Sequence, residues 1–239
     1  MSKHSRRQHT RKREDGRGRH GVARALLTLL RTILALAVVA ATVVGGYAIY
    51  LESHYARIPD DELVQTGKAG AEDAARQLEP GREYTAATYN IGFGAYTPDY
   101  TFFMDEGRMA DGTPTRGTSS TATSRESVEA CTQGDVSSLR DAFGGEGPDF
   151  VLLQEVDVDS DRSHHVNQVK AFEGAFAGYQ SVFASNFHSG FLAWPITAPH
   201  GRVSSGLLTL SDANVTSATR RSYPVDESFP TKFFDLDRC

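Results

Sequence analysis

A run of twenty uncharged residues, Thr32 to Leu51, restricts what this chain can fold into more than any other feature. A helix rises about 1.5 Å per residue, so the run can cross a hydrocarbon core of roughly 30 Å. A buried helix of a soluble domain fits poorly, because a dense cationic segment precedes the run. A cleaved signal peptide is the stronger alternative, since Ala40 and Ala41 resemble a cleavage site. The run is longer than the roughly 7–15 apolar residues of such peptides, which favours an uncleaved transmembrane helix over 32–51.

The segment before the run is strongly basic. Residues 1–31 contain ten Lys or Arg against Glu14 and Asp15. Basic flanks stay in the cytoplasm, so we expect a cytoplasmic N-terminus and an extracytoplasmic domain after Leu51. Low apolar content predicts a disordered head. The head could bind nucleic acid, but its position beside a span favours anionic membrane lipid as its partner.

The charge of the remaining chain limits its function. The formal net charge of −5 includes the basic head, so the residues after it are clearly acidic. This argues against a broad basic surface for nucleic acid. The two cysteines, Cys131 and Cys239, show no metal-ligand spacing. An extracytoplasmic compartment permits a disulfide between them, but an unpaired Cys131 is favoured. The sequence gives no indication of a protein partner.

Pattern and turn residues divide the rest of the chain. Residues 52–83 are predicted to form a stalk with a short helix between 59 and 81. The domain of residues 84–239 opens with a strand over 83–94, a Gly- and Thr-rich loop, a helix over 125–143 capped by Ser124, and a strand over 149–156. Strand, helix and strand in that order predict an α/β fold. The further predictions are a helix over 164–178 and strands over 179–186, 203–211, 215–225 and from 229.

Two polar residues stand where predicted strands end. Asn90 ends "AATYN" and Glu155 lies near the end of "DFVLLQEV". Ligands of open α/β sheets bind beyond the carboxyl ends of strands. A carboxylate there can hold Mg²⁺, and an amide can contact phosphate without adding charge. Taken alone, a Glu at a strand end is usually solvated, and an Asn there often forms a turn.

The two motifs together resemble the endonuclease/exonuclease/phosphatase superfamily. The stretches "TYNIGFG" and "VLLQEVD" match its first two motifs, and "SNFHSGFLAWPITAPHG" and "SSGLLTLS" are similar to segments leading to its central strands. The resemblance covers about 84–239. It implies the first half of a four-layered α/β sandwich and metal-dependent phosphoesterase activity, with Mg²⁺ or Mn²⁺ as the metal. It also implies Glu155 as the metal ligand and Asn90 as a catalytic residue that orders metal and phosphate.

The sequence departs from this family after Glu155. The family's later Asp-x-Asn pair and its C-terminal Asp-His pair have no counterpart here, which implies an incomplete and inactive fragment. The predicted function is therefore that of a membrane-tethered, Mg²⁺-dependent phosphoesterase, of which this chain is expected to be a fragment. Its substrate is a phosphate ester: nucleic acid, a phospholipid head group or a small molecule. The alternative is a non-catalytic, membrane-anchored binding module with the same fold.

Other side chains are weaker candidates. Arg162 and His188 are predicted to contact substrate. Trp194 and Phe191 either pack in the core or form a wall for a base or lipid. The acidic stretch 157–165 either binds a cation or forms a solvated loop.

Overall fold

The computed structural model describes residues 4–68 and 76–239. The chain divides into two compact units, one ending at Glu52 and the other running from Ser53 to Cys239. The described residues of the first unit belong to one helix. The second contains the described strands and the remaining helices.

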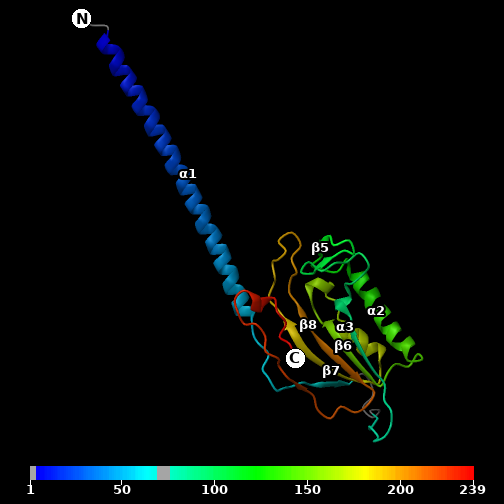
Figure 1. Cartoon of the computed structure of the whole chain (residues 1–239). Coiled ribbons are helices and arrows are strands. Elements are labelled where there is room, and N and C mark those ends of the chain that lie inside the picture. The colour runs from blue at the N-terminus through cyan, green and yellow to red at the C-terminus, as the bar shows by residue number, and fades with distance from the viewer. Residues whose placement is uncertain (1–3, 69–75) are drawn as a thin grey trace. The chain divides into compact units, whose positions relative to one another are not determined.

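Helix α1, His4–His54, contains the apolar run (Figure 1). Its segment Gly21–His54 is long and apolar enough to cross a membrane, and its most apolar window is unburied. A signal sequence near an N-terminus meets the same criterion. The hydroxyls of Thr28, Thr32 and Thr42 donate to the carbonyl oxygens four residues earlier. These polar groups therefore have partners within the helix, as an apolar environment requires.

The basic head differs from the prediction of disorder, because α1 includes it from His4 onward. Arg, Lys, Leu and Ala have high helix propensity. Extending an existing helix gains a hydrogen bond for each residue added, whereas starting one is costly. The apolar run thus provides the nucleus from which the helix continues toward the N-terminus.

The second unit is built on a mixed five-stranded sheet. Its strand order is β2-β7-β8-β6-β3. Strands β3 and β6 are parallel and are joined through helix α2, while the other pairs are antiparallel. An α/β fold with a strand–helix–strand unit is confirmed, and a four-layered sandwich stays a prediction. The elements are β2 Thr66–Lys68, β3 Ala86–Asn90, α2 Arg125–Ala142, β6 Phe150–Asp157, β7 Gln180–His188 and β8 Ser204–Ser211.

Helices α2 and α3 (Gln168–Ala175) pack against one face of this sheet (Figure 1). The predicted cap of α2 is present, since the Ser124 side chain accepts a hydrogen bond from the Ser127 N–H. Helix α3 is capped by Asn167 in the same way. The core between helices and sheet consists of Ile91, Val136, Leu139, Val151, Leu153, Val156, Phe172, Phe176, Leu208 and Leu210.

The predicted stalk is wrong for residues 53–68. Strand β2 pairs with β7, and β1 (Glu62–Leu63) pairs with β9 (Thr219–Arg220). No helix forms over 59–68, and residues 69–75 lie outside the described part. Local composition favours a helix here, but the free edge of β7 offers hydrogen bonds that an isolated short helix cannot match.

The C-terminal segment also differs from the prediction. Of the strand expected over 215–225, only β9 forms, and the strand expected from 229 is replaced by the short 3-10 helix η3, Thr231–Phe233. Buried Arg220 explains the irregular path. Its guanidinium donates to the carbonyl oxygens of Ser185 and Asp237, which ties the segment to the end of β7.

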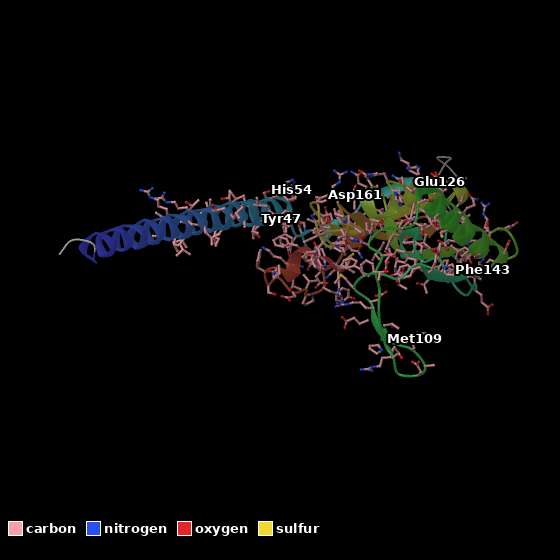
Figure 2. All side chains as sticks on the ribbon, turned by 90° about the horizontal axis from the view of Figure 1, so that it is seen from above. Tyr47, His54, Met109, Glu126, Phe143 and Asp161 are labelled. Atoms are coloured by element: carbon pink, nitrogen blue, oxygen red, sulfur yellow. The ribbon has the colours of Figure 1, made fainter. Side chains whose placement is uncertain are left out.

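The long loop after Tyr96 contains a hairpin that the sequence did not indicate. Strands β4 (Glu106–Arg108) and β5 (Pro114–Arg116) pair antiparallel. Figure 2 shows this hairpin projecting from the domain with Met109 near its tip.

Two β-bulges meet at Gly206. Between the pairs Leu153–Leu208 and Val156–Gly206, strand β6 has one residue more than β8. Strand β7 has one extra residue, Asn186, opposite the same part of β8. A Cβ on Gly206 would lie under 3.0 Å from the Ala184 carbonyl oxygen. Only glycine therefore fits where the three strands come together.

We expect Gly206→Ala to destabilise the domain, because the added methyl group must displace backbone in the sheet centre. A loss of about 1–3 kcal/mol is typical of such overpacking. Gly134→Ala is the control, since nothing lies within 4 Å of a Cβ at this position in α2. That change should raise stability by about 0.5–1 kcal/mol. Urea denaturation of the full chain measures both, and equal effects would contradict the assigned constraint.

Candidate functional site

Asn90 and Glu155 lie together, as their motifs predicted. Asn90 pairs with Gln154 across the parallel strands β3 and β6. Its amide Nδ2 donates a hydrogen bond of 2.9 Å to Glu155 Oε1. Residues sixty-five positions apart thus form one polar pair at the carboxyl ends of two adjacent parallel strands, where ligands of α/β sheets usually bind.

A β-bulge directs the Glu155 side chain toward Asn90. Its backbone has φ +55°, in the left-handed region, and it lies where β6 has its extra residue. A non-glycine residue in this region is strained by about 1–3 kcal/mol and often occurs at a functional position. In a regular strand, side chains alternate between the two faces of the sheet. The bulge breaks that alternation at Glu155.

The turn after β3 holds Asn90 in place. Its Oδ1 accepts a hydrogen bond of 2.9 Å from the Gly92 N–H, so both ends of the amide have partners. The short 3-10 helix η1, Gly92–Gly94, follows. Gly92 has φ +51°, and a Cβ there would collide with the Tyr96 ring. The two glycines of the motif thus permit a sharp turn beside Asn90.

Arg162 lies under this turn. Its guanidinium is 6% exposed and donates to both carboxylate oxygens of Asp157, at 2.8 and 3.0 Å. It also lies 3.9 Å from the centroid of the Phe93 ring. These contacts assign Arg162 a structural role in fixing the turn. Its predicted contact with substrate stays a prediction.

Glu155 borders two cavities. The first, called the α2 cavity, is about 450 Å³ and lies between the turn after β3 and helix α2. The second, called the arginine cavity, is about 320 Å³. Tyr96 also lines both. The α2 cavity is lined by Tyr89, Asn90, Ile91, Gly92, Gly94, Tyr96, Cys131, Gly134, Asp135, Ser138 and Glu155.

Asp135 is a second acidic group of the α2 cavity, and sequence reasoning missed it. Burial raises the pKa of its carboxyl, and the Tyr89 hydroxyl, its hydrogen-bond partner, opposes the rise. Its Oδ2 is buried without a partner among the described residues. One indication of its burial was present in the sequence, since Asp135 directly precedes Val136, which belongs to the buried face of α2.

The arginine cavity adds two residues that the sequence did not single out. Asn186 is the extra residue of the second bulge, and His200 belongs to the loop between β7 and β8. The Nδ1 of His200 lies 2.8 Å from the Ser120 carbonyl oxygen, which can only accept. The neutral ring therefore carries its proton on Nδ1 and keeps Nε2 as an acceptor.

The remaining candidates lie elsewhere. His188 lines a small cavity of about 20 Å³ together with Tyr55 and Asp237, and Glu155 does not border it. The prediction that Trp194 and Phe191 pack in the core is wrong. Trp194 is 57% exposed, and Phe191 is exposed as well.

The acidic stretch 157–165 forms internal contacts rather than a cation cluster. His165 contacts the carboxylates of Asp159 and Asp161. The Arg202 backbone N–H donates to Asp161 as well. Across the described residues, no three His, Cys, Asp or Glu side chains come together as a metal-binding group.

The Asn90–Glu155 pair fits one part of a Mg²⁺ site. Mg²⁺ keeps several waters and often binds only one or two carboxylates together with substrate phosphate. Glu155 supplies one carboxylate, and Asn90 Oδ1 has a second lone pair beyond its bond to Gly92. The described residues thus offer a partial set of oxygen ligands of the kind this cation prefers.

Cys131 and Cys239 are both unpaired, as the sequence favoured for Cys131. Burial raises the pKa of each thiol. A raised pKa reduces the thiolate fraction, so neither group has the depressed pKa of a cysteine nucleophile.

We expect His200 to make stability depend on pH. Burial, together with the nearby Arg162 charge, lowers its pKa from 6.5 to about 4. The unfolded chain binds this proton near pH 6.5 and the folded chain only near pH 4. The free energy of unfolding should therefore fall by about 3 kcal/mol as pH drops through this range.

Urea denaturation of the full chain at pH 7, 6, 5 and 4 measures this dependence. His200→Asn is the control, because its amide can still donate to the Ser120 carbonyl but does not titrate. The variant should lose most of the slope between pH 6.5 and 4. Identical slopes in both proteins would show that other groups cause the effect.

Comparison of the chain with protein-family models, curated proteins and solved structures gave no match. The resemblance to the endonuclease/exonuclease/phosphatase superfamily therefore rests on the sequence motifs and stays a prediction.

Proposed function

We propose that this protein is a membrane-tethered, Mg²⁺-dependent phosphoesterase whose site is built on Asn90 and Glu155. The observation that carries the proposal is their 2.9 Å hydrogen bond at the carboxyl ends of β3 and β6. Two motifs that resemble one family of phosphoesterases thus meet in space. The open α2 cavity beside the pair provides room for a phosphate ester.

The chemistry follows from the groups present. Glu155 would hold Mg²⁺, with Mn²⁺ as a substitute, and the cation would offset the negative charge of the phosphate. Asn90 would keep the Glu155 carboxylate oriented through its Nδ2 and the turn fixed through its Oδ1. In hydrolysis, the oxygen of a water molecule bonds to phosphorus, the ester P–O bond breaks, and the released alcohol takes up a proton.

The described site contains one carboxylate in contact with Asn90, so we expect weak binding of Mg²⁺ and slow turnover by the chain alone. Binding of cation and phosphate is therefore the more sensitive measurement. Binding without any turnover would favour the alternative function, a membrane-anchored module that binds phosphate esters without hydrolysing them.

Glu155→Gln should abolish cation binding at the site and any Mg²⁺-dependent hydrolysis, while leaving the fold intact. The change removes the ligating charge but keeps the side-chain volume and an oxygen that can accept from Asn90. Mn²⁺ binding by electron paramagnetic resonance and hydrolysis of bis(p-nitrophenyl) phosphate are the two measurements.

Glu129→Gln is the matched control, because this exposed glutamate pairs with Arg125 on the surface of α2 and lines neither cavity that Glu155 borders. It should bind Mn²⁺ as the original protein does. Equal binding by the Glu155 and Glu129 variants would count decisively against the proposed metal ligand.

The tether is the other part of the proposal. Helix α1 spans the membrane without cleavage, and the ten Lys or Arg of residues 1–31 hold the N-terminus in the cytoplasm. The substrate is then reached from outside the cytoplasm.

Protease added to intact cells should remove the domain after Ser53 and spare an epitope placed before Met1. This result is expected because basic residues beside a transmembrane helix stay on the cytoplasmic side. Protection of the C-terminal domain would contradict the orientation. A secreted product that starts after Ala41 would show a cleaved signal peptide instead.

A further inference from the structure

A third cavity lies beside the proposed site and has no role in it. This cavity, called the tryptophan cavity, is open, about 650 Å³ in volume and mainly apolar. Its walls come from the two ends of the β4–β5 hairpin, the loop after β7 and the segment around η3. The lining residues are Phe103, Met104, Arg116, Gly117, Thr118, Trp194, Pro195, Pro230, Thr231 and Phe234.

The tryptophan cavity adjoins the arginine cavity. Phe103, Met104 and Phe234 line both. Glu155 also lines the arginine cavity but not the tryptophan cavity. The domain therefore has a continuous lining that changes from polar at Glu155 to apolar at Trp194.

The charged side chains of this lining lie mainly in the arginine cavity, at the end near Glu155. Among the described residues that line the tryptophan cavity, Arg116 is the charged one, and it is paired with Glu106 at 2.6 Å. The arginine cavity holds Asp105 and Glu155 together with Arg162, whose charge Asp157 balances. A ligand that fits the whole lining has an apolar chain at one end and a group that binds a cation at the other.

We propose that the arginine and tryptophan cavities hold the apolar chain of an amphiphilic phosphate ester whose phosphate lies at Asn90 and Glu155. This inference rests on the proposed phosphoesterase function and narrows its substrate class. The tail contacts Phe103, Met104 and Trp194. Met104 and Trp194 are 56% and 57% exposed, so binding a chain would remove their apolar surface from water.

The charge of the domain disfavours nucleic acid as the occupant. Residues 53–239 contain 15 Lys or Arg and 27 Asp or Glu. Binding of a nucleic-acid backbone draws most of its affinity from lysine and arginine contacts with phosphates. An ester with one phosphate and an apolar chain needs only one cationic position, which a metal held by Glu155 would supply.

The chain has a single tryptophan, Trp194, so its fluorescence reports directly on this cavity. The full chain in amphipol is titrated with butyl, hexyl and octyl phosphate in the presence of Mg²⁺. We expect a saturable blue shift whose affinity rises about fourfold per added methylene, which corresponds to about 0.8 kcal/mol for each buried CH₂. Octanol, which lacks the phosphate, should bind more weakly than octyl phosphate.

Two methionines provide matched variants. Met104→Asp places a charge in the wall shared by both cavities, whereas Met109→Asp places one on the hairpin near its tip, at 59% exposure (Figure 2). Met104→Asp should remove the dependence of affinity on chain length, and Met109→Asp should keep it. Met104→Ala should weaken octyl phosphate binding, which checks that the charged variant acts through the wall rather than through unfolding.

The outcomes separate this inference from the function on which it rests. Equal affinity for the three alkyl phosphates, equal effects of the two methionine variants, or octanol binding as tight as octyl phosphate would overturn the apolar-chain proposal. If chain length matters but Glu155→Gln and removal of Mg²⁺ change nothing, then the apolar cavity stands and the assignment of Glu155 to the phosphate is wrong.

Discussion

The buried ion pair between Asp157 and Arg162 is the interaction on which the rest of the site depends. Asp157 ends β6 and is fully buried, and its carboxylate accepts from Arg162 and from the Ser163 hydroxyl. Removing one partner of a buried pair costs about 3–5 kcal/mol, because the other charge is left without compensation. Since the Arg162 guanidinium also lies on the Phe93 ring, the pair connects the loop after β6 with the turn after β3.

A hydrogen-bond network extends this connection to the helices. The Asp157 backbone N–H donates to Gln168 Oε1 at the start of α3, and Gln168 Nε2 donates to Thr132 Oγ1 in α2. Gln168 is buried and its amide is satisfied at both ends, so it holds one orientation. The ends of β3 and β6 and the two helices therefore form one rigid support for Asn90 and Glu155. Groups held in this way need little reorganisation when a ligand binds.

The double bulge adds a second constraint. Strand β8 contributes Gly206, whose missing side chain lets β6 and β7 each carry an extra residue. These extra positions bring Glu155 and Asn186 to the arginine cavity. Regular strands would be more stable, since the left-handed φ of Glu155 is unfavourable. The strain is consistent with the proposed role of Glu155 in binding a cation, because it directs the carboxylate to Asn90.

The sequence by itself determined the features that depend on local pattern. These include the apolar helix, the strand–helix–strand unit with its Ser124 cap, and the placement of Asn90 and Glu155 at neighbouring strand ends. Apolar periodicity and turn residues suffice for such features, because each depends on residues close together in the chain or on a general rule for parallel strands.

Only the tertiary structure decided the features that depend on distant partners. Residues 66–68 have the composition of a stalk, yet they form β2 because β7 offers a free edge. The sequence predicts that Arg162 contacts substrate, and only the fold reveals that it pairs with Asp157 and lies on the Phe93 ring. Asp135, His200 and Trp194 gain their positions only when loops far apart in the chain close around the three cavities. Contacts of this kind leave no local pattern, since the energy that selects them comes from packing and hydrogen bonds made after the chain has folded.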